Sequence, residues 1–328
     1  MCLPLTILNM QVLGTVQSLL AGGVCVPMDR IDIMGIAAWL GDFGVQRMYG
    51  TPPILYDLLT HDVDPAAVAR LTHFGVGGAK TPSALFTQYR ERFGREVVTG
   101  YGLTEAPTSV TGVLDGDGSP PPIGSAGRAR PQLSVTIRNG DEVLGPDQEG
   151  EICVGPTDAG RYAACYTTML GYWNRPDATE AALHGGVLHT GDVGLLDPQG
   201  ILWVRDRRSE LILRGGANVY PAEVERVVES TGLVAEAAVV GRAHPRLGEE
   251  VVGFVAPVDG VDLDLASLDA ACRAELARYK VPVTWYVVES FPRNAMGKVL
   301  KPSLRDWLAA GEPEREDLQV VRHDAGRP

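Results

Sequence analysis

Short apolar runs alternate with amphipathic segments over the first 113 residues. The apolar runs have the length of buried strands and lie at residues 23–26, 46–49 and 96–98. Between them, residues 32–40 and 83–93 carry apolar side chains at helical spacing. Strands that alternate with helices are typical of an α/β sheet layer. We therefore predict a partial large α/β domain here, with the apolar opening at residues 2–28 buried in its core.

The pattern changes after a loop rich in Asp, Gly and Pro at residues 115–122. Short alternating runs at 134–138 and 151–154 predict strands, and residues 186–207 predict a hairpin. The hairpin turns at Asp197-Pro198-Gln199-Gly200, where Pro and Gly suit a tight turn. We predict a β-barrel-like subdomain from this region.

The last third of the chain predicts a small α+β lobe. Pro221 suits the first position of a helix whose inner face carries Val224, Val227 and Val228. Apolar runs predict strands at residues 234–240, 251–255 and 283–288, and a second helix presents Leu265, Leu268, Cys272 and Leu276. We expect one domain at 1–208, the lobe at 209–310 and a frayed, charged tail at 311–328.

Composition narrows the range of partners. The chain has 328 residues and a net charge of −12, which disfavours nucleic acid or an anionic membrane as partner because both attract clustered Lys and Arg. Its five scattered cysteines lack the paired spacing of a zinc site, and they fit a reducing cytoplasm. Polar residues interrupt the apolar opening and no basic segment precedes it, so we expect neither a signal peptide nor a membrane span.

Three glycine-rich stretches fail the common nucleotide-binding patterns. Residues 75–81 end like a Walker A loop but have Ala79 where that loop needs glycine. Gly297-Lys298 is followed by Val299 instead of Ser or Thr, and Gly215-Gly216 lacks a third glycine at Rossmann spacing. None of the three is a general phosphate-binding fingerprint.

Taken in order, however, the motifs resemble those of the adenylate-forming superfamily, and in particular the AMP-forming acyl-CoA synthetases. The resemblance covers roughly residues 3–308. Its motifs are Gly50-Thr51-Pro52-Pro53, Gly77-Gly78-Ala79, Tyr101-Gly102-Leu103-Thr104-Glu105, Gly150-Glu151-Ile152, Gly171-Tyr172-Trp173-Asn174-Arg175-Pro176, Thr190-Gly191-Asp192, Asp206-Arg207, the stretch from Gly215 to Glu225, and that from Pro292 to Lys298. The resemblance implies the fold of these enzymes, with a small mobile carboxyl-terminal lobe.

The resemblance also implies which residues handle the phosphates. Attack of a carboxylate on the α-phosphate of ATP builds negative charge on phosphoryl oxygens, so catalysis depends on positioning and on cations. Thr104 matches the family's phosphate-contacting hydroxyl, and Glu105 matches its Mg²⁺-associated carboxylate. The alternative for this pair is structural, with Thr104 capping a helix and Glu105 favouring its positive end.

Nucleoside recognition is implied for a second set of residues. Tyr101, with Gly102 beside it, would flank the adenine, and Asp192 would accept hydrogen bonds from the ribose hydroxyls. Arg207 would bind the ribose and phosphate region through its fork of donors. The alternatives are a core tyrosine, a turn aspartate and a surface ion pair. Gly77, Gly78 and Ala79 would line the acyl pocket beside the adenine.

Lys298 matches the family's catalytic lysine, which bridges the acid carboxylate and the α-phosphate while the adenylate forms. The alternative is an ordinary solvated lysine. After adenylation the small lobe of the family swings about a hinge and presents a Gly-Gly segment, here Gly215 and Gly216, to coenzyme A. The hinge position is usually Asp or Lys, and here it is Ser209.

The amino terminus departs from the family's pattern in two respects. We expect the Ser/Thr/Gly-rich loop that wraps the β- and γ-phosphates to be missing, because the chain starts at the segment that follows it. The position of the pocket-gating histidine carries Ile7. We therefore expect a chain that is truncated at its amino terminus, with a partner chain as one source of the missing region.

The predicted function is an ATP-dependent carboxylic acid–CoA ligase that forms an acyl-AMP intermediate, with Mg²⁺ as the ion and a fatty acid as the favoured substrate. Two alternatives stay open. One is an adenylation enzyme that loads a carrier protein, although no carrier segment follows Lys298. The other is a fragment that binds nucleotide without turnover.

Overall fold

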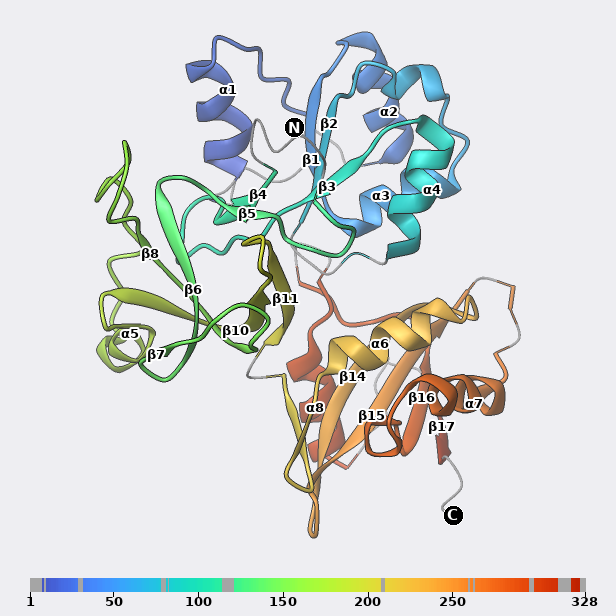
Figure 1. Ribbon diagram of the computed structural model, residues 1–328. Coiled ribbons are helices and arrows are strands. Elements are labelled where there is room, and N and C mark those ends of the chain that lie inside the picture. Colours follow the sequence, from blue (N-terminus) through green and yellow to red (C-terminus); the bar gives the residue numbers. More distant parts are fainter. Residues whose placement is uncertain are drawn as a thin grey trace. The chain divides into compact units, whose positions relative to one another are not determined.

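A computed structural model of the chain describes residues 8, 10–28, 32–77, 81, 83–113, 121–207, 210–258, 260, 261, 263–294, 298–311 and 320–324. The chain divides into two compact units, Met1–Val204 and Arg205–Pro328, and each is considered by itself (Figure 1). The predicted domain boundary after residue 208 falls on residues outside the described ones and stays a prediction.

The first unit contains a parallel three-stranded sheet in the order β1 (Arg47–Gly50), β2 (His73–Val76) and β3 (Val97–Thr99). Helices α2 (Ile33–Asp42), α3 (Pro52–Thr60) and α4 (Ser83–Phe93) pack beside it, with a short 3-10 turn at Pro65–Val68 (Figure 1). Asp32 caps α2 by accepting a 2.7 Å hydrogen bond from the Gly35 amide, and Pro52 opens α3. The predicted α/β layer is confirmed.

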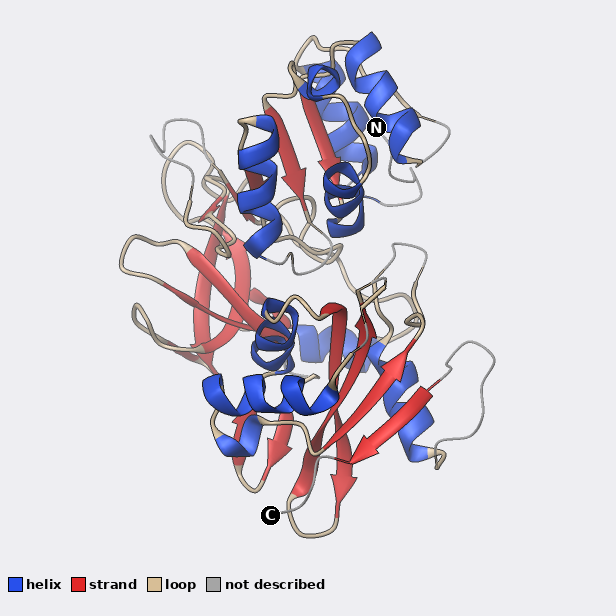
Figure 2. Ribbon diagram, turned by 90° about the vertical axis from the view of Figure 1, so that its right-hand side faces the viewer, coloured by secondary structure: helices blue, strands red, loops and turns tan. Residues whose placement is uncertain are grey.

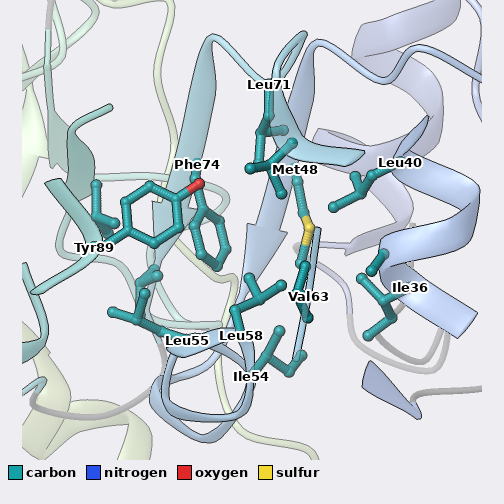
Figure 3. Packing of buried hydrophobic residues seen from close by; sticks show 14 of the residues in the cluster. Ile36, Leu40, Met48, Ile54, Leu55, Leu58, Val63, Leu71, Phe74 and Tyr89 are labelled. Carbon is teal, nitrogen blue, oxygen red and sulfur yellow. The ribbon is translucent and has the colours of Figure 1, made fainter. Parts of the chain in front are cut away.

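The core of this sheet layer is apolar and closely packed. Side chains of the three helices meet those of β1 and β2, and among them Ile36, Leu55, Leu58 and Phe74 are at most 1% exposed (Figure 3). Complete burial of side chains of this size contributes about 1.5–3 kcal/mol each to folding. This close packing fixes the ends of the strands in this sheet, and the motifs of the candidate site follow those ends.

The apolar opening is not the buried core that its composition suggested. A π-helical turn spans Met10–Val16 and a short helix α1 spans Gln17–Leu20, and residues 23–28 have no regular structure. Within residues 8 and 10–28, Met10 is the one buried side chain, while Leu20 is 84% and Val24 is 87% exposed. The predicted strand at 23–26 is therefore wrong. An apolar pattern reports what a segment would bury, but not whether another element covers it.

A second sheet runs in the order β11 (Leu202–Arg207), β10 (Val187–Leu196), β8 (Gly150–Pro156), β6 (Leu133–Asn139) and β7 (Glu142–Val143), and β11 continues past Val204, the last residue of the first unit. A two-residue strand β9 (Leu183–His184) also pairs with β10, after helix α5 (Pro176–Ala182). The predicted hairpin is confirmed. Barrel closure is not found within the described residues, because the ladder ends at β7, which pairs over two residues only. A separate pair, β4 (Thr111–Gly112) and β5 (Arg128–Ala129), adjoins the Tyr101 motif.

The second unit is an α+β sandwich. Its sheet runs β13 (Ala217–Val219), β12 (Ile212–Arg214), β15 (Gly248–Pro257), β16 (Thr284–Val288) and β17 (Val320–Asp324), and β14 (Val234–His244) also pairs with β15. Helices α6 (Pro221–Ser230) and α7 (Leu265–Glu275) cover one face, and α8 (Lys301–Ala309) covers the other (Figure 2). A short 3-10 turn lies at Arg278–Lys280.

Alternation along the strands of this sheet assigns side chains to its two faces. Trp285 packs in the cluster with α6 and α7, while its neighbour Tyr286 packs in the cluster with α8. The predicted inner face of α6 is confirmed, since Val224, Val227 and Val228 are at most 1% exposed. Strand β17 lies within the segment predicted as a tail and pairs with β16.

Candidate active site

The motif from Tyr101 to Glu105 forms an anchored loop. The Tyr101 carbonyl accepts hydrogen bonds from the amides of Val110 and Thr111, and the Tyr101 amide donates to the Thr111 hydroxyl at 3.0 Å. Ala106 and Val110 of this loop are buried in the core beneath it, whereas Thr104 is exposed. This loop carries the residues predicted to meet the phosphates.

Thr104 and Glu105 lie at the tip of this loop. They occupy a turn closed by the Ala106 amide, which donates to the Leu103 carbonyl at 3.2 Å. Thr104 is exposed, and Glu105 accepts a 3.0 Å hydrogen bond from the hydroxyl of Tyr172. No helix begins in residues 105–113, so capping does not explain the pair in this part of the chain. The contact with Tyr172 joins two motifs of the resemblance.

Asp192 lies on a bulge in β10. In the ladder between β10 and β8, His189 pairs with Cys153 and Val193 pairs with Glu151. An advance of four residues along β10 therefore corresponds to an advance of two along β8. The two extra residues interrupt the alternation of side chains along the strand. Gly191 takes a φ of +73° within the bulge, a conformation that favours glycine. The Thr190-Gly191-Asp192 motif therefore redirects a side chain out of a regular strand.

The bulge brings Asp192 to Tyr101. The Tyr101 hydroxyl donates a 2.6 Å hydrogen bond to Oδ2 of Asp192, across 91 residues of sequence. Asp192 is 6% exposed, so its carboxylate is held in a nearly buried position by a neutral donor. Two side chains predicted to bind one nucleoside thus lie in direct contact. A ring beside a carboxylate suits a nucleoside, whose base is flat and whose ribose carries a cis-diol.

Arg207 and Lys298 lie in the second unit, and both are exposed. The carboxylate of Asp206 accepts from the amides of Arg207 at 2.8 Å and Ala222 at 2.9 Å, and burial raises the pKa of Asp206. Asp206 therefore links the backbone at Arg207 to the first turn of α6. The roles of Arg207 and Lys298 toward a nucleotide stay predictions.

Two hydrogen bonds join Lys298 to Asn294. The Asn294 amide donates to the Lys298 carbonyl, and the Lys298 amide donates to the Asn294 side chain, both at 3.0 Å. One residue further, Arg293 and Val299 form a bridge between the two arms. These bonds fix the backbone of Lys298 while its side chain stays exposed.

Gly215 and Gly216 form the turn between β12 and β13. Their φ angles are +60° and +85°, and Arg214 pairs with Ala217 directly before and after them. Two residues with positive φ are what a two-residue hairpin of this twist requires. Local conformation thus accounts for both glycines, and their approach to coenzyme A stays a prediction. Gly78, Ala79 and Ser209 lie outside the described residues.

Family models match both units of the chain. The model described as AMP-binding enzyme matches residues 1–173, and the model described as AMP-binding enzyme C-terminal domain matches residues 223–298. The chain belongs to the AMP-binding enzyme family.

Two curated relatives of the chain are CoA ligases. A 2-succinylbenzoate–CoA ligase of Geobacillus kaustophilus is 40% identical over 238 residues, which are 72% of this chain and 46% of that protein. The long-chain-fatty-acid–CoA ligase FadD13 of Mycobacterium tuberculosis is 36% identical over 242 residues, 74% of this chain and 46% of that protein. The chain thus spans about half the length of the curated relatives it matches.

Solved structures of the o-succinylbenzoate CoA synthetase of Bacillus subtilis also resemble the chain. The complex with its acyl-adenylate intermediate gives a TM-score of 0.80 at 29% identity and covers 97% of this chain and 61% of that one. The complex with ATP and a magnesium ion gives 0.79 at 31% identity, with 94% and 60% covered. The fold predicted from the resemblance is therefore confirmed.

A buried ion cluster near the Lys298 loop was not predicted from the sequence. Lys301 forms ion pairs with Glu210 at 2.9 Å and with Glu225 at 2.8 Å. Burial alone would lower the pKa of Lys301, but the carboxylates of Glu225, Glu210 and Asp206 outweigh it and raise that pKa. Burial also raises the pKa of Glu225, and the charge of Lys301 opposes that shift. The cluster joins Lys301, at the start of α8, to Glu225 in α6 and to Glu210. Its one sequence signal is a lysine three residues beyond Lys298.

A second cluster, Glu151, Cys153 and His189, brings three potential metal-ligand atoms within 4.8 Å of one another. Each is already engaged. His189 donates from Nδ1 to Glu151 at 3.0 Å, and burial, with the charge of Glu151, raises the pKa of the Cys153 thiol to about 12. Nε2 of His189 is buried without a hydrogen-bond partner, but a metal held there together with Cys153 would require that thiol to lose its proton. We assign this cluster to the architecture of the β10 bulge.

Across the described part of the chain, every helix is too short or too polar to cross a lipid bilayer.

Proposed function

We propose that the chain acts in the ATP-dependent ligation of a carboxylic acid to coenzyme A through an acyl-AMP intermediate. The observation that carries the proposal is the hydrogen bond between Tyr101 and Asp192, which joins two motifs predicted to bind one nucleoside. Membership of the AMP-binding enzyme family and the names of the curated relatives support the same activity.

The first half-reaction joins the acid to AMP. A carboxylate oxygen of the acid attacks the α-phosphorus of ATP, and the bond to the leaving pyrophosphate breaks. Asp192 would hold the ribose hydroxyls and Tyr101 would lie against the adenine. The hydroxyl of Thr104 would donate to a phosphoryl oxygen, and the ammonium group of Lys298 would offset the charge that builds up between carboxylate and phosphate.

Glu105 is the residue that would hold Mg²⁺. A carboxylate suits this ion, which prefers oxygen ligands and usually binds through one or two carboxylates together with substrate phosphates. The Tyr172 hydroxyl donates to Oε1 of Glu105, which restricts the rotation of the carboxylate. When bound, Mg²⁺ supplies positive charge next to the leaving pyrophosphate.

The second half-reaction transfers the acyl group to coenzyme A. The thiol sulfur attacks the acyl carbon, its proton is lost, and AMP leaves. We propose that Arg207 contacts the nucleotide, and that Gly215 and Gly216 lie along the coenzyme A path after the small lobe has moved.

A fatty acid is the substrate class we propose. A partner chain and a cytoplasmic location complete the proposal. The free thiols of Cys25, Cys153, Cys165 and Cys272 are consistent with that location.

The test is pyrophosphate release by the purified 328-residue chain. The reaction contains ATP, Mg²⁺ and one acid from a panel of long-chain fatty acids, short-chain acids and 2-succinylbenzoate, with Lys298→Ala as control. We expect release that depends on the acid and is lost in the control. A second measurement adds coenzyme A and detects the thioester.

The outcomes separate the alternatives. Release without a thioester, but with transfer to a phosphopantetheine-bearing carrier, identifies a carrier-loading enzyme. AMP binding without release from any acid identifies a fragment that binds nucleotide without turnover. Release with 2-succinylbenzoate alone would overturn the fatty acid proposal and leave the ligase intact.

A further inference from the structure

The bulge that carries Asp192 leaves backbone amides outside the β8–β10 ladder. The Asp192 amide donates to the Thr190 hydroxyl at 3.1 Å, and that hydroxyl donates to the Ile152 carbonyl at 2.7 Å. The Gly191 amide donates to Oε1 of Glu151 at 3.0 Å. One of the polar groups of the bulge is therefore satisfied by a side chain of the neighbouring strand.

Glu151 also holds the residue before the bulge. Its second oxygen, Oε2, lies 3.0 Å from Nδ1 of His189. Since a carboxylate only accepts hydrogen bonds, Nδ1 carries the proton. The His189 ring stacks on His184 at 3.6 Å with an interplanar angle of 12°, which restrains it from the other side. One carboxylate thus bridges His189 and Gly191, the residues on both sides of Thr190.

The bridge is sheltered from solvent. The side chains of His189 and Glu151 are 6% and 16% exposed. Water competes weakly at such a site, and a hydrogen bond to a charged group contributes more there than one at the surface. These contacts therefore hold the bulge in the conformation in which Asp192 meets Tyr101.

We propose that Glu151 is a positioning residue of the nucleotide site, because its carboxylate holds the bulge that presents Asp192; this inference rests on the proposed function. The contacts of Glu151 described above are with His189 and Gly191. Glu151 acts through Asp192, and its removal lets the bulge relax and the Asp192 carboxylate move.

The experiment measures AMP affinity by calorimetry, since this readout does not need turnover. Glu151→Leu removes both acceptors, and we expect it to weaken AMP binding about tenfold. Glu151→Gln keeps the shape and one acceptor oxygen, so we expect an intermediate loss. Glu142→Leu, at an exposed position on β7 of the same sheet, removes one negative charge without touching the bulge and serves as the matched control.

A double-mutant cycle separates positioning from general structure. In an Asp192→Asn background the position of the side chain matters less, so we expect Glu151→Leu to change AMP affinity by less than about twofold. Equal losses in both backgrounds would show that Glu151 acts on the sheet as a whole and would overturn the inference. If Glu151→Leu fails to fold, the same double-mutant cycle is measured with Glu151→Gln.

The same experiments distinguish the two proposals. A wild-type chain that binds no AMP would overturn the proposed function and this inference together. A wild-type chain that binds AMP, with both Glu151 variants unchanged from it, would overturn the inference alone. If turnover is present, we expect Glu151→Leu to raise KM for ATP and to leave kcat within about twofold, as for an interaction made equally in ground and transition states.

Discussion

The hydroxyl of Tyr101 donates a 2.6 Å hydrogen bond to the carboxylate of Asp192. The two residues belong to motifs that lie 91 residues apart, and a bulge in β10 is what turns Asp192 toward Tyr101. The contact orients the carboxylate through a neutral donor and does not neutralise its charge. It therefore prepares Asp192 to accept hydrogen bonds from a diol.

Asp192→Asn is expected to weaken the binding of AMP and of ATP alike, by about 10- to 100-fold, because hydrogen bonds to a charged acceptor contribute about 1.5–3 kcal/mol. Tyr101→Phe removes only the orienting bond and keeps the ring, so we expect a loss of about fivefold. Calorimetry with each nucleotide measures both effects. Unchanged AMP affinity in Asp192→Asn would show that Asp192 does not contact the ribose.

Lys298→Ala is expected to abolish acid-dependent pyrophosphate release and to spare thioester formation from a supplied acyl-adenylate. The reason is that the cation is needed while charge builds up on carboxylate and phosphate, and not after the adenylate has formed. The two half-reactions are assayed separately. Lys280→Ala, which loses an ion pair with Glu223 on the same unit, is the matched control. An equal loss of both half-reactions would refute a role confined to adenylation.

Lys301→Met is expected to lower the free energy of unfolding of the second unit by about 3–5 kcal/mol, because it leaves the carboxylates of Glu210 and Glu225 buried without their cation. Urea unfolding followed by tryptophan fluorescence measures the change, since Trp285 and Trp307 lie in the cores of this unit.

Two further variants test the cause of the Lys301→Met loss. Adding Glu225→Gln removes one of the unpaired charges and is expected to restore part of the stability. Lys280→Met removes a more exposed pair with Glu223, and we expect a loss below about 1 kcal/mol. If Lys280→Met were as damaging as Lys301→Met, burial of the cluster would not be the cause.

The buried thiols predict a loss of stability at alkaline pH. Burial, with nearby carboxylates, raises the pKa of Cys153 and of Cys272 from 9.0 to about 12. Above pH 9 the unfolded thiols lose protons that the folded ones keep, so the free energy of unfolding falls as pH rises from about 9 to 12. Each thiol contributes at most about 1.4 kcal/mol per pH unit to this slope.

Urea unfolding at pH 8 and pH 10.5 tests this alkaline slope, and Cys272→Ala is expected to flatten it. At pH 8 a thiol reagent is expected to modify the exposed Cys165 first and to reach the buried Cys153 and Cys272 only on unfolding. Rapid modification of Cys272 in the folded chain, or an unchanged slope in Cys272→Ala, would contradict the assigned pKa shift.

Local patterns predicted a large part of this fold. A turn with Pro and Gly between two short runs identified the hairpin of β10 and β11, and helical spacing identified the inner face of α6, because these patterns depend on neighbours a few residues away. The ordered motifs identified the family for the same reason, since each is a short string of residue types. Nothing local indicated that the sheet of β6 to β11 stays open, because closure depends on which strands meet at its ends.

The sequence by itself determined the family and named the candidate residues, because residue type and order are all that a motif requires. Only the tertiary structure decided which of them meet. It brought Asp192 to Tyr101 through two extra residues in β10, and it placed Glu151 beneath that bulge. It also buried Lys301 between two carboxylates from distant segments. The physical reason is that strand register and desolvation are set by partners far away in the chain, and no spacing along the sequence records them.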